Sequence, residues 1–271
     1  MRDYFNKNSD RLLTKKLWLF DMDGTIYLEN DLFKGVKELL SYIVKNGGNY
    51  VFITNNSSKS VSDYVNKING MGIVANEDNF FTSAQASVLV LKEKFGNGLI
   101  YAQGTNSFIT GLKDAGLNIT TEYDESVKAI LVGFDTELTG EKLRTTSKML
   151  TKVDVPYFAT NPDWVCPVDF GYIPDCGSMC ESYYRATGKR PTFIGKPEPT
   201  MVNVVSKKFG VDKNDVVVLG DRLYTDIASG VNAGVDTVFV LSGEATLKDL
   251  EQSEVKPTFT LNGVWEILEG N

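Results

Sequence analysis

Apolar stretches of strand length alternate with amphipathic stretches of helix length along most of this 271-residue chain. The first strand candidate, at residues 17–20, is apolar at odd and even positions alike, which is typical of a strand buried on both faces of a parallel sheet. We expect such strands at residues 17–20, 50–53, 192–195 and 216–220. Apolar residues recur at helical spacing at 31–48, 60–71, 82–95 and 201–209, and Thr82 or Ser83 is a suitable N-cap for the third of these helices. This order predicts an α/β fold with a parallel sheet and right-handed crossovers.

The middle of the chain, residues 85–190, repeats this alternation with elements of its own. Strands are expected at 99–101, 127–132 and 155–159, and helices at 106–115, 140–152 and 177–187. After this block, a strand at 236–241 and a helix at 264–268 end the pattern. Periodicity alone leaves open whether the block continues the first sheet or forms an inserted domain.

The first buried strand runs directly into two acidic residues, Asp21 and Asp23. Because side chains alternate along a strand, these two carboxylates start on the same side. Gly24 follows and permits a sharp turn of the backbone, and Thr25 completes the sequence D-M-D-G-T. A lone D-x-D is most simply explained as a strand ending in an acidic turn. Whether it is part of a functional site therefore depends on the residues at the ends of the other strands.

Polar residues also follow the other three expected buried strands. Thr54 and Asn55 follow the second strand, Lys196 the third, and Asp221 the fourth, with Asp226 five residues later. Taken singly, each is an ordinary turn, loop lysine or helix start. Because the carboxyl ends of parallel strands share one edge of a sheet, we expect all of them to converge in one crevice, as in an active site.

These residue types suit phosphate chemistry. Asp21 and Asp221 offer the hard oxygen ligands that Mg²⁺ prefers, while Thr54, the amides after it and Lys196 can donate to phosphate oxygens. A carboxylate can attack phosphorus, and a second acid can protonate the leaving oxygen.

Composition narrows the choice of chemistry. The chain has no histidine, which excludes Ser-His and Cys-His nucleophiles and imidazole-bound metals. A formal net charge of -7 without any basic run argues against a nucleic-acid partner. No apolar stretch approaches the roughly 20 residues of a membrane span, and residues 1–16 lack the pattern of a signal peptide. Cys166, Cys176 and Cys180 fit reduced thiols, so we expect a cytoplasmic protein.

The ordered motifs resemble those of the haloacid dehalogenase (HAD) superfamily of aspartyl-phosphate phosphatases. The matching motifs are D-x-D-G-T at 21–25, Thr54-Asn55, Lys196, and Gly220-Asp221 with Asp226. The stretches 81–84, 159–163 and 194–197 are similar to its p-nitrophenyl phosphatase and phosphoglycolate phosphatase (NagD-like) branch. The resemblance implies a Rossmann-like parallel-sheet core formed by residues 1–84 and 191–271, with an inserted α/β cap of the C2 type at residues 85–190.

The resemblance also implies a role for each motif residue. Asp21 is expected to attack phosphorus and to bind Mg²⁺, and Asp23 to act as general acid and base while its backbone carbonyl contacts the metal. Thr54 and the amide of Asn55 are expected to bind the phosphoryl oxygens, and Lys196 to neutralise Asp21 and the phosphate.

Two further expectations concern the metal and the cap. Asp221 is expected to bind Mg²⁺, and Asp226 to orient the metal site. Asn161 and Asp163 follow a cap strand and are expected to bind the substrate, with Asp163 on the leaving group. An N-P-D capping turn explains these two residues equally well.

The function expected from the resemblance is a Mg²⁺-dependent phosphatase of small phosphorylated metabolites. Expected substrates are sugar phosphates, phosphoglycolate, nucleoside monophosphates and aryl phosphates such as p-nitrophenyl phosphate. The alternatives are a phosphometabolite-binding or receiver-like regulatory protein without turnover, and a dehalogenase, which needs neither Mg²⁺ nor the acid at Asp23. In a receiver, that acid would hydrolyse the phosphoaspartate on which the signal depends. No membrane partner is expected, and a homodimer is left open.

Overall fold

The computed structural model describes residues 1–168 and 170–269, and these form two compact units. The first contains Met1–Thr54, Val61–Phe81 and the chain from Lys196 onward, and the second contains Asn55–Ser60 and Thr82–Gly195. The chain therefore changes units at 54/55, 60/61, 81/82 and 195/196. The division at 84/85 and 190/191 made from the sequence stays a prediction of domain bounds.

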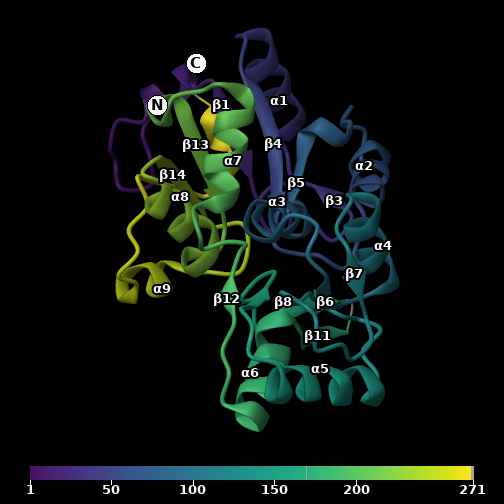
Figure 1. Cartoon of the computed structure of the whole chain (residues 1–271). Helices are drawn as coiled ribbons and strands as arrows, with labels where there is room; N and C mark the ends of the chain where they lie inside the picture. The colour runs from purple at the N-terminus through teal and green to yellow at the C-terminus, as the bar shows by residue number, and fades with distance from the viewer. Residues whose placement is uncertain (169, 270–271) are drawn as a thin grey trace. The chain divides into compact units, whose positions relative to one another are not determined.

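The first unit is built on a six-stranded sheet with the order β15-β14-β13-β1-β4-β5 (Figure 1). Its strands are β1 (Leu17–Phe20), β4 (Asn49–Thr54), β5 (Phe80–Thr82), β13 (Val216–Gly220), β14 (Asp236–Val240) and β15 (Phe259–Leu261). β1 pairs in parallel with β13 on one side and β4 on the other, so that Phe20 lies between Leu219 and Phe52. This register brings the carboxyl ends of the three central strands to one edge of the sheet.

Helices pack against this sheet because their apolar stripes need a partner. These helices are α1 (Val36–Lys45), α2 (Val61–Gly70), α7 (Thr200–Phe209), α8 (Ala228–Ala233) and α9 (Leu247–Gln252). The buried side chains of α1 share one core with Trp18, Phe20 and Phe52 of the sheet. Short 3-10 turns lie at Asp10–Thr14, Glu77–Asn79, Lys213–Asp215 and Val264–Ile267, and a π-helical turn at Leu223–Ile227 precedes α8.

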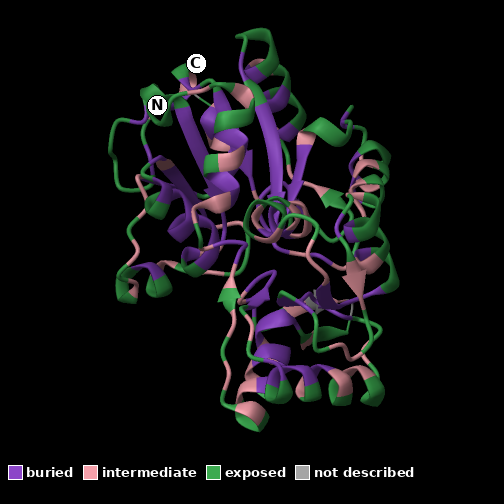
Figure 2. Ribbon diagram, in the orientation of Figure 1, coloured by how far each residue is buried: buried purple, intermediate pink, exposed green. Residues whose placement is uncertain are grey.

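The second unit has a separate parallel sheet with the order β12-β9-β8-β6-β7. Its strands are β6 (Ile100–Gln103), β7 (Ile119–Thr120), β8 (Ala129–Val132), β9 (Tyr157–Ala159) and β12 (Thr192–Phe193). Its helices are α3 (Ser83–Phe95), α4 (Asn106–Asp114), α5 (Gly140–Lys152) and α6 (Cys176–Thr187). Two antiparallel hairpins complete the chain, β10 (Val165–Val168) with β11 (Gly171–Pro174) here, and β2 (Tyr27–Leu28) with β3 (Asp31–Leu32) in the first unit. In both units the sheet strands are mostly buried and the helices are buried on one side (Figure 2).

The structure confirms the α/β fold and answers the question that periodicity left open. The middle of the chain has its own five-stranded sheet and its own apolar core, so it does not continue the first sheet. The predicted helix cap is also correct, because the Thr82 hydroxyl accepts the Gln85 N–H and the Gln85 side chain accepts the Thr82 N–H.

Three of the expected elements were wrong in detail. Residues 31–32 form strand β3 rather than the start of a helix, and α1 begins only after Gly35, whose φ of 75° ends the extended chain. The segment 264–267 is a 3-10 turn. The strand before Lys196 is the two-residue β12, which pairs with β9 in the second sheet and not with the core strands.

Candidate active site

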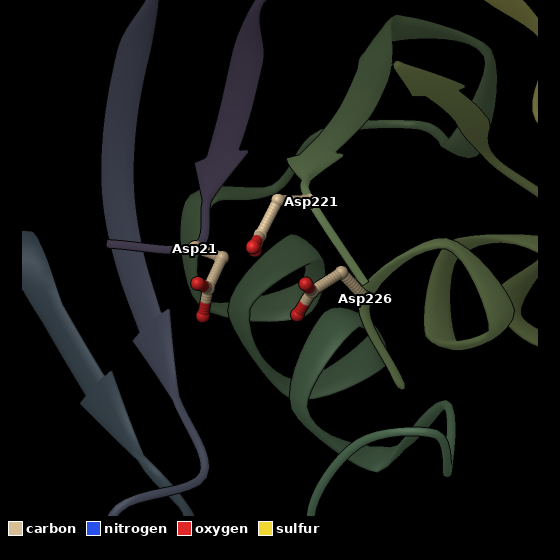
Figure 3. A group of neighbouring side chains, drawn as sticks. All are labelled: Asp21, Asp221 and Asp226. Atoms are coloured by element: carbon tan, nitrogen blue, oxygen red, sulfur yellow. The ribbon is translucent and has the colours of Figure 1, made fainter. Parts of the chain in front are cut away.

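Three carboxylates lie together where central strands of the six-stranded sheet end. Asp21 follows β1, Asp221 follows β13, and Asp226 lies in the π-helical turn beyond Asp221. One carboxylate oxygen from each lies within 4.8 Å of the other two. Figure 3 shows the three side chains turned toward one common region. The predicted convergence is therefore correct for these residues, because the neighbouring parallel strands β1 and β13 end at the same level and the turn after β13 adds Asp226.

Lys196 lies between two of these carboxylates. Its buried Nζ donates to Asp21 Oδ1 and to Asp226 Oδ1, at 2.6 Å each, and to the carbonyl of Ile53 at 3.3 Å. Asp226 Oδ2 also accepts the backbone N–H of Arg222 at 3.0 Å. Lys196 reaches the site from the turn before α7, so its position depends on packing and not on the end of a core strand.

Burial and mutual repulsion govern the protonation of this cluster. Burial, and then the charge of Asp226, raise the pKa of Asp21 to about 8, although Lys196 acts in the opposite direction. Burial and Asp226 likewise raise the pKa of Asp221 to about 7. For Lys196, burial alone would lower the pKa, but Asp21 and Asp226 outweigh it and the net shift is upward. When all three carboxylates are ionised, they exceed the one ammonium by two negative charges, which a divalent cation would balance.

Asp221 is held in a way that leaves one oxygen for a further ligand. Its Oδ2 accepts the backbone N–H of Glu244 at 2.7 Å. Its Oδ1 is buried and has no hydrogen-bond partner among residues 1–168 and 170–269. A buried carboxylate oxygen without a donor is costly, and a cation is the partner that such an oxygen suits. This observation and the all-oxygen donor set show that the cluster fits Mg²⁺.

The loop after β14 encloses Asp221 and was not among the sites predicted from the sequence. A Cβ added at Gly243 would lie 2.0 Å from Asp221 Oδ2, and one added at Gly24 would lie 2.4 Å from the same atom. The Ser242 hydroxyl donates to the carbonyl of Gly24 at 2.7 Å, which ties this loop to the D-x-D-G-T turn. In the sequence, this loop could have been found from Ser242-Gly243, a Ser-Gly pair that follows the strand expected at 236–241.

Asp23 lies on the turn after β1 and is exposed. Burial, and then the neighbouring charge of Asp23, raise the pKa of the buried Tyr27 hydroxyl, so this carboxylate lies beside a phenol. Gly24 has a φ of 75° and donates its N–H to the carbonyl of Tyr27 at 2.8 Å, which closes the turn. Asp23 is thus an exposed carboxylate two residues after Asp21 of the cluster.

The remaining candidates divide between the two units. Thr54 is buried at the end of β4 in the first unit. Asn55, Asn161 and Asp163 belong to the second unit, where Asn55 Nδ2 donates to Asp163 Oδ2 at 3.1 Å and Asn161 Nδ2 donates to the carbonyl of Asn55 at 2.9 Å. Arg222 forms an ion pair with Glu244 at 2.8 Å. All three cysteines are free thiols.

Comparison with known proteins agrees with this arrangement. A family model described as haloacid dehalogenase-like hydrolase matches residues 18–118, and a second model described as HAD-hydrolase-like matches residues 193–267. The acid sugar phosphatase of Staphylococcus saprophyticus is 34% identical over 94% of this chain and 97% of its own length. The chain belongs to the haloacid dehalogenase-like hydrolase family. Most of the second unit falls between the two matched segments, as an inserted cap does.

Solved structures place the chain more finely within the family. The 4-nitrophenylphosphatase of Thermotoga maritima is 38% identical, with a TM-score of 0.89 over 95% of this chain and 97% of its own. NagD of E. coli is 28% identical, with a TM-score of 0.84 over 93% of this chain and 98% of its own. The chain is thus a phosphatase of the NagD-like, p-nitrophenyl phosphatase branch, as the sequence motifs predicted.

Proposed function

We propose that this protein is a Mg²⁺-dependent phosphatase that hydrolyses small phosphomonoesters through an aspartyl-phosphate on Asp21. The observation that carries the proposal is the cluster of Asp21, Asp221 and Asp226, in which Lys196 pairs with the first and the last and one buried oxygen of Asp221 is left for a cation. Sugar phosphates and aryl phosphates such as p-nitrophenyl phosphate are the proposed substrates, because relatives named for such activities match over nearly the whole chain. Phosphoglycolate and nucleoside monophosphates belong to the same chemical class and stay predictions.

The carboxylates of Asp21 and Asp221 and the backbone carbonyl of Asp23 are the proposed protein ligands of Mg²⁺. When bound, the ion supplies positive charge to the phosphoryl oxygens and offsets the two excess negative charges of the cluster. Asp226 orients Lys196 through the 2.6 Å ion pair and accepts a hydrogen bond from the backbone N–H of Arg222. It therefore positions these neighbours without needing to bind the ion itself.

The proposed reaction has two displacements. In the first, a carboxylate oxygen of Asp21 bonds to phosphorus while the bond from phosphorus to the leaving oxygen breaks, and the carboxylic acid of Asp23 gives its proton to that oxygen. In the second, the Asp23 carboxylate takes a proton from water, whose oxygen attacks phosphorus. The bond between phosphorus and Asp21 then breaks, which releases inorganic phosphate and restores both side chains.

The groups that bind the phosphoryl oxygens are proposed to be Thr54, the backbone N–H of Asn55, and Lys196. Lys196 already donates to Asp21 at 2.6 Å, so its charge is fixed beside the nucleophile before a substrate arrives. Such preorganised donors are worth more in a buried site than in water, because they need no reorganisation during the reaction.

Phosphate release from a panel of metabolite phosphates and p-nitrophenyl phosphate, with Mg²⁺ and with EDTA, tests this proposal. Wild-type protein should release phosphate only with Mg²⁺, and Asp21→Asn should release none. Asp23→Asn should slow turnover most for poor leaving groups, because these need the proton. Release that persists in Asp21→Asn, or that EDTA does not reduce, would contradict the mechanism.

Family membership favours turnover over the alternative of a phosphometabolite-binding or receiver-like regulatory protein. None of the helices within residues 1–168 and 170–269 combines the length and apolar character that crossing a bilayer requires. The cytoplasmic location and the absence of a nucleic-acid partner stay predictions, and the question of a homodimer stays open.

A further inference from the structure

We propose that Asn161 and Asp163 are positioning residues that fix Asn55, and that they do not contact the substrate's leaving group. The inference rests on the proposed function, in which the backbone N–H of Asn55 binds a phosphoryl oxygen. All the residues that carry it belong to the second unit: Asn55, Ser83, Asn161, Asp163 and Gly195, together called the Asn55 cluster.

Asn55 is held through both its backbone and its side chain. Its carbonyl accepts Asn161 Nδ2 at 2.9 Å and the Ser83 hydroxyl at 2.6 Å. Its side-chain amide donates to Asp163 Oδ2 at 3.1 Å. The Asn55 carbonyl therefore accepts two hydrogen bonds, and the side-chain amide donates one to a carboxylate. Rotation about ψ or χ1 of Asn55 would break a buried hydrogen bond, so both angles have little freedom.

The contacts of Asn161 settle which way its amide points. Its Oδ1 accepts the backbone N–H of Asp163 at 3.0 Å, so its Nδ2 is the atom that faces the Asn55 carbonyl. Both Asn161 and Asp163 are buried, with exposed fractions of 0% and 4%. The side chains of Asn161 and Asp163 therefore form one connected hydrogen-bond network with Asn55.

The turn that carries Asn161 and Asp163 is built tightly onto α6. The carbonyl of Asp163 accepts the N–H of Gly177 at 2.8 Å, and a Cβ added at Gly177 would lie 2.2 Å from the carbonyl oxygen of Pro162. The turn cannot shift without moving the first turn of the helix. It is thus a rigid support for Asn55.

Backbone packing encloses the other side of Asn55. A Cβ added at Gly195 would lie 2.5 Å from Asn55 Oδ1, 2.6 Å from the carbonyl of Thr160 and 3.1 Å from the Cβ of Ser83. Asn55, Ser83 and Gly195 each lie within two residues of a point where the chain passes from one unit to the other. The Asn55 cluster therefore fixes the residue that continues directly from Thr54 in the chain.

This arrangement makes a prediction that leaving-group recognition does not. If Asp163 acts only through Asn55, its loss weakens the binding of the phosphoryl group itself, whatever is attached to it. A contact to the leaving group would instead matter only for substrates that carry a suitable group.

The test compares Asp163→Ala with wild type in three measurements: the affinity for inorganic phosphate by calorimetry with Mg²⁺ present, and kcat/KM for p-nitrophenyl phosphate and for a hexose phosphate. We expect phosphate affinity to fall, and both kcat/KM values to fall by one common factor of about tenfold to a hundredfold, since displacements near 1 Å have effects of this size. Asp163→Asn keeps an oxygen that can accept from Asn55 and should restore most of the loss.

Tyr183→Phe is the matched control, because it removes a buried 2.5 Å hydrogen bond to Gln103 in the same unit without touching the Asn55 cluster. Tyr183→Phe should leave phosphate affinity unchanged. A loss of phosphate affinity in Tyr183→Phe as large as that in Asp163→Ala would overturn the inference. Unchanged phosphate affinity in Asp163→Ala, or a kcat/KM loss confined to one substrate, would also overturn it. Should Asp163→Ala fail to fold, Asn161→Ser in the same three measurements decides.

The two proposals fail differently. A wild-type protein that releases no phosphate from any substrate would contradict the proposed function. An active wild type whose phosphate affinity survives the loss of Asp163 would contradict only the positioning role.

Discussion

Replacing Gly243 by alanine should disable the metal site without altering any charged group. The added Cβ would lie 2.0 Å from Asp221 Oδ2 and 2.4 Å from its Cγ. Ordinary van der Waals contact begins at 3.4 Å, so the carboxylate or the loop would have to move by about 1.4 Å. Movement of the loop is restrained, because Ser242 is bonded to the carbonyl of Gly24 and the N–H of Ala245 to the carbonyl of Asp221.

The size of the effect follows from what this movement breaks. Asp221 Oδ2 would lose the 2.7 Å bond from the Glu244 N–H, and a hydrogen bond to a charged group contributes about 1.5–3 kcal/mol. That corresponds to a loss of Mg²⁺ affinity of about tenfold or more. Misplacing a reacting group by about 1 Å can cost about a hundredfold in rate, so kcat/KM should fall by roughly that factor.

Mg²⁺ affinity by calorimetry and kcat/KM for p-nitrophenyl phosphate measure the two effects. Gly111→Ala is the matched control, because nothing lies within 4 Å of a Cβ at this position in α4. It should leave both quantities unchanged and stabilise the protein by up to about 1 kcal/mol, the helix preference of alanine over glycine. A Gly243→Ala protein with Mg²⁺ affinity and kcat/KM within twofold of wild type would refute the argument that this close approach holds Asp221.

Two further predictions concern the charges of the cluster. Lys196→Met should lower the free energy of unfolding in urea by roughly 3–5 kcal/mol, because breaking a buried ion pair strands the charges of Asp21 and Asp226, and a loss below about 1 kcal/mol would contradict this. In EDTA, stability should fall as the pH rises through about 8, because the folded state raises the pKa of Asp21 to about 8 and so favours its protonated form at low pH. Mg²⁺ should therefore raise Tm more at about pH 8.5 than at about pH 6. An equal rise in Tm at both pH values would contradict the raised pKa of Asp21 in the folded state.

Much of the fold was predictable because local rules and the tertiary structure agree. Strand β1 is apolar at every position and buried at every position, as a central parallel strand must be. The Thr82 cap and the helix that it starts were likewise readable, since capping depends on residues three positions apart. The prediction for 31–48 was wrong at its start because Asp31 and Leu32 pair with Leu28 and Tyr27 in a hairpin, which helical periodicity does not reveal.

The sequence by itself determined the chemistry of this protein. The absence of histidine, the D-x-D-G-T turn and the acids after β13 are statements about which atoms are present, and they already predicted phosphoryl transfer with a hard cation. The positions of Asp21 and Asp221 were also within reach, because neighbouring parallel strands end at one edge.

Only the tertiary structure decided the contacts that depend on long-range packing. Lys196 belongs to the first unit although the strand before it pairs in the second sheet, and its ion pairs with Asp21 and Asp226 form within the first unit. Gly243 encloses Asp221 from 22 positions away in the chain, and Asn161 binds the carbonyl of Asn55 from 106 positions away. No local period encodes such contacts, because they form only when separate elements pack and bring their loops together.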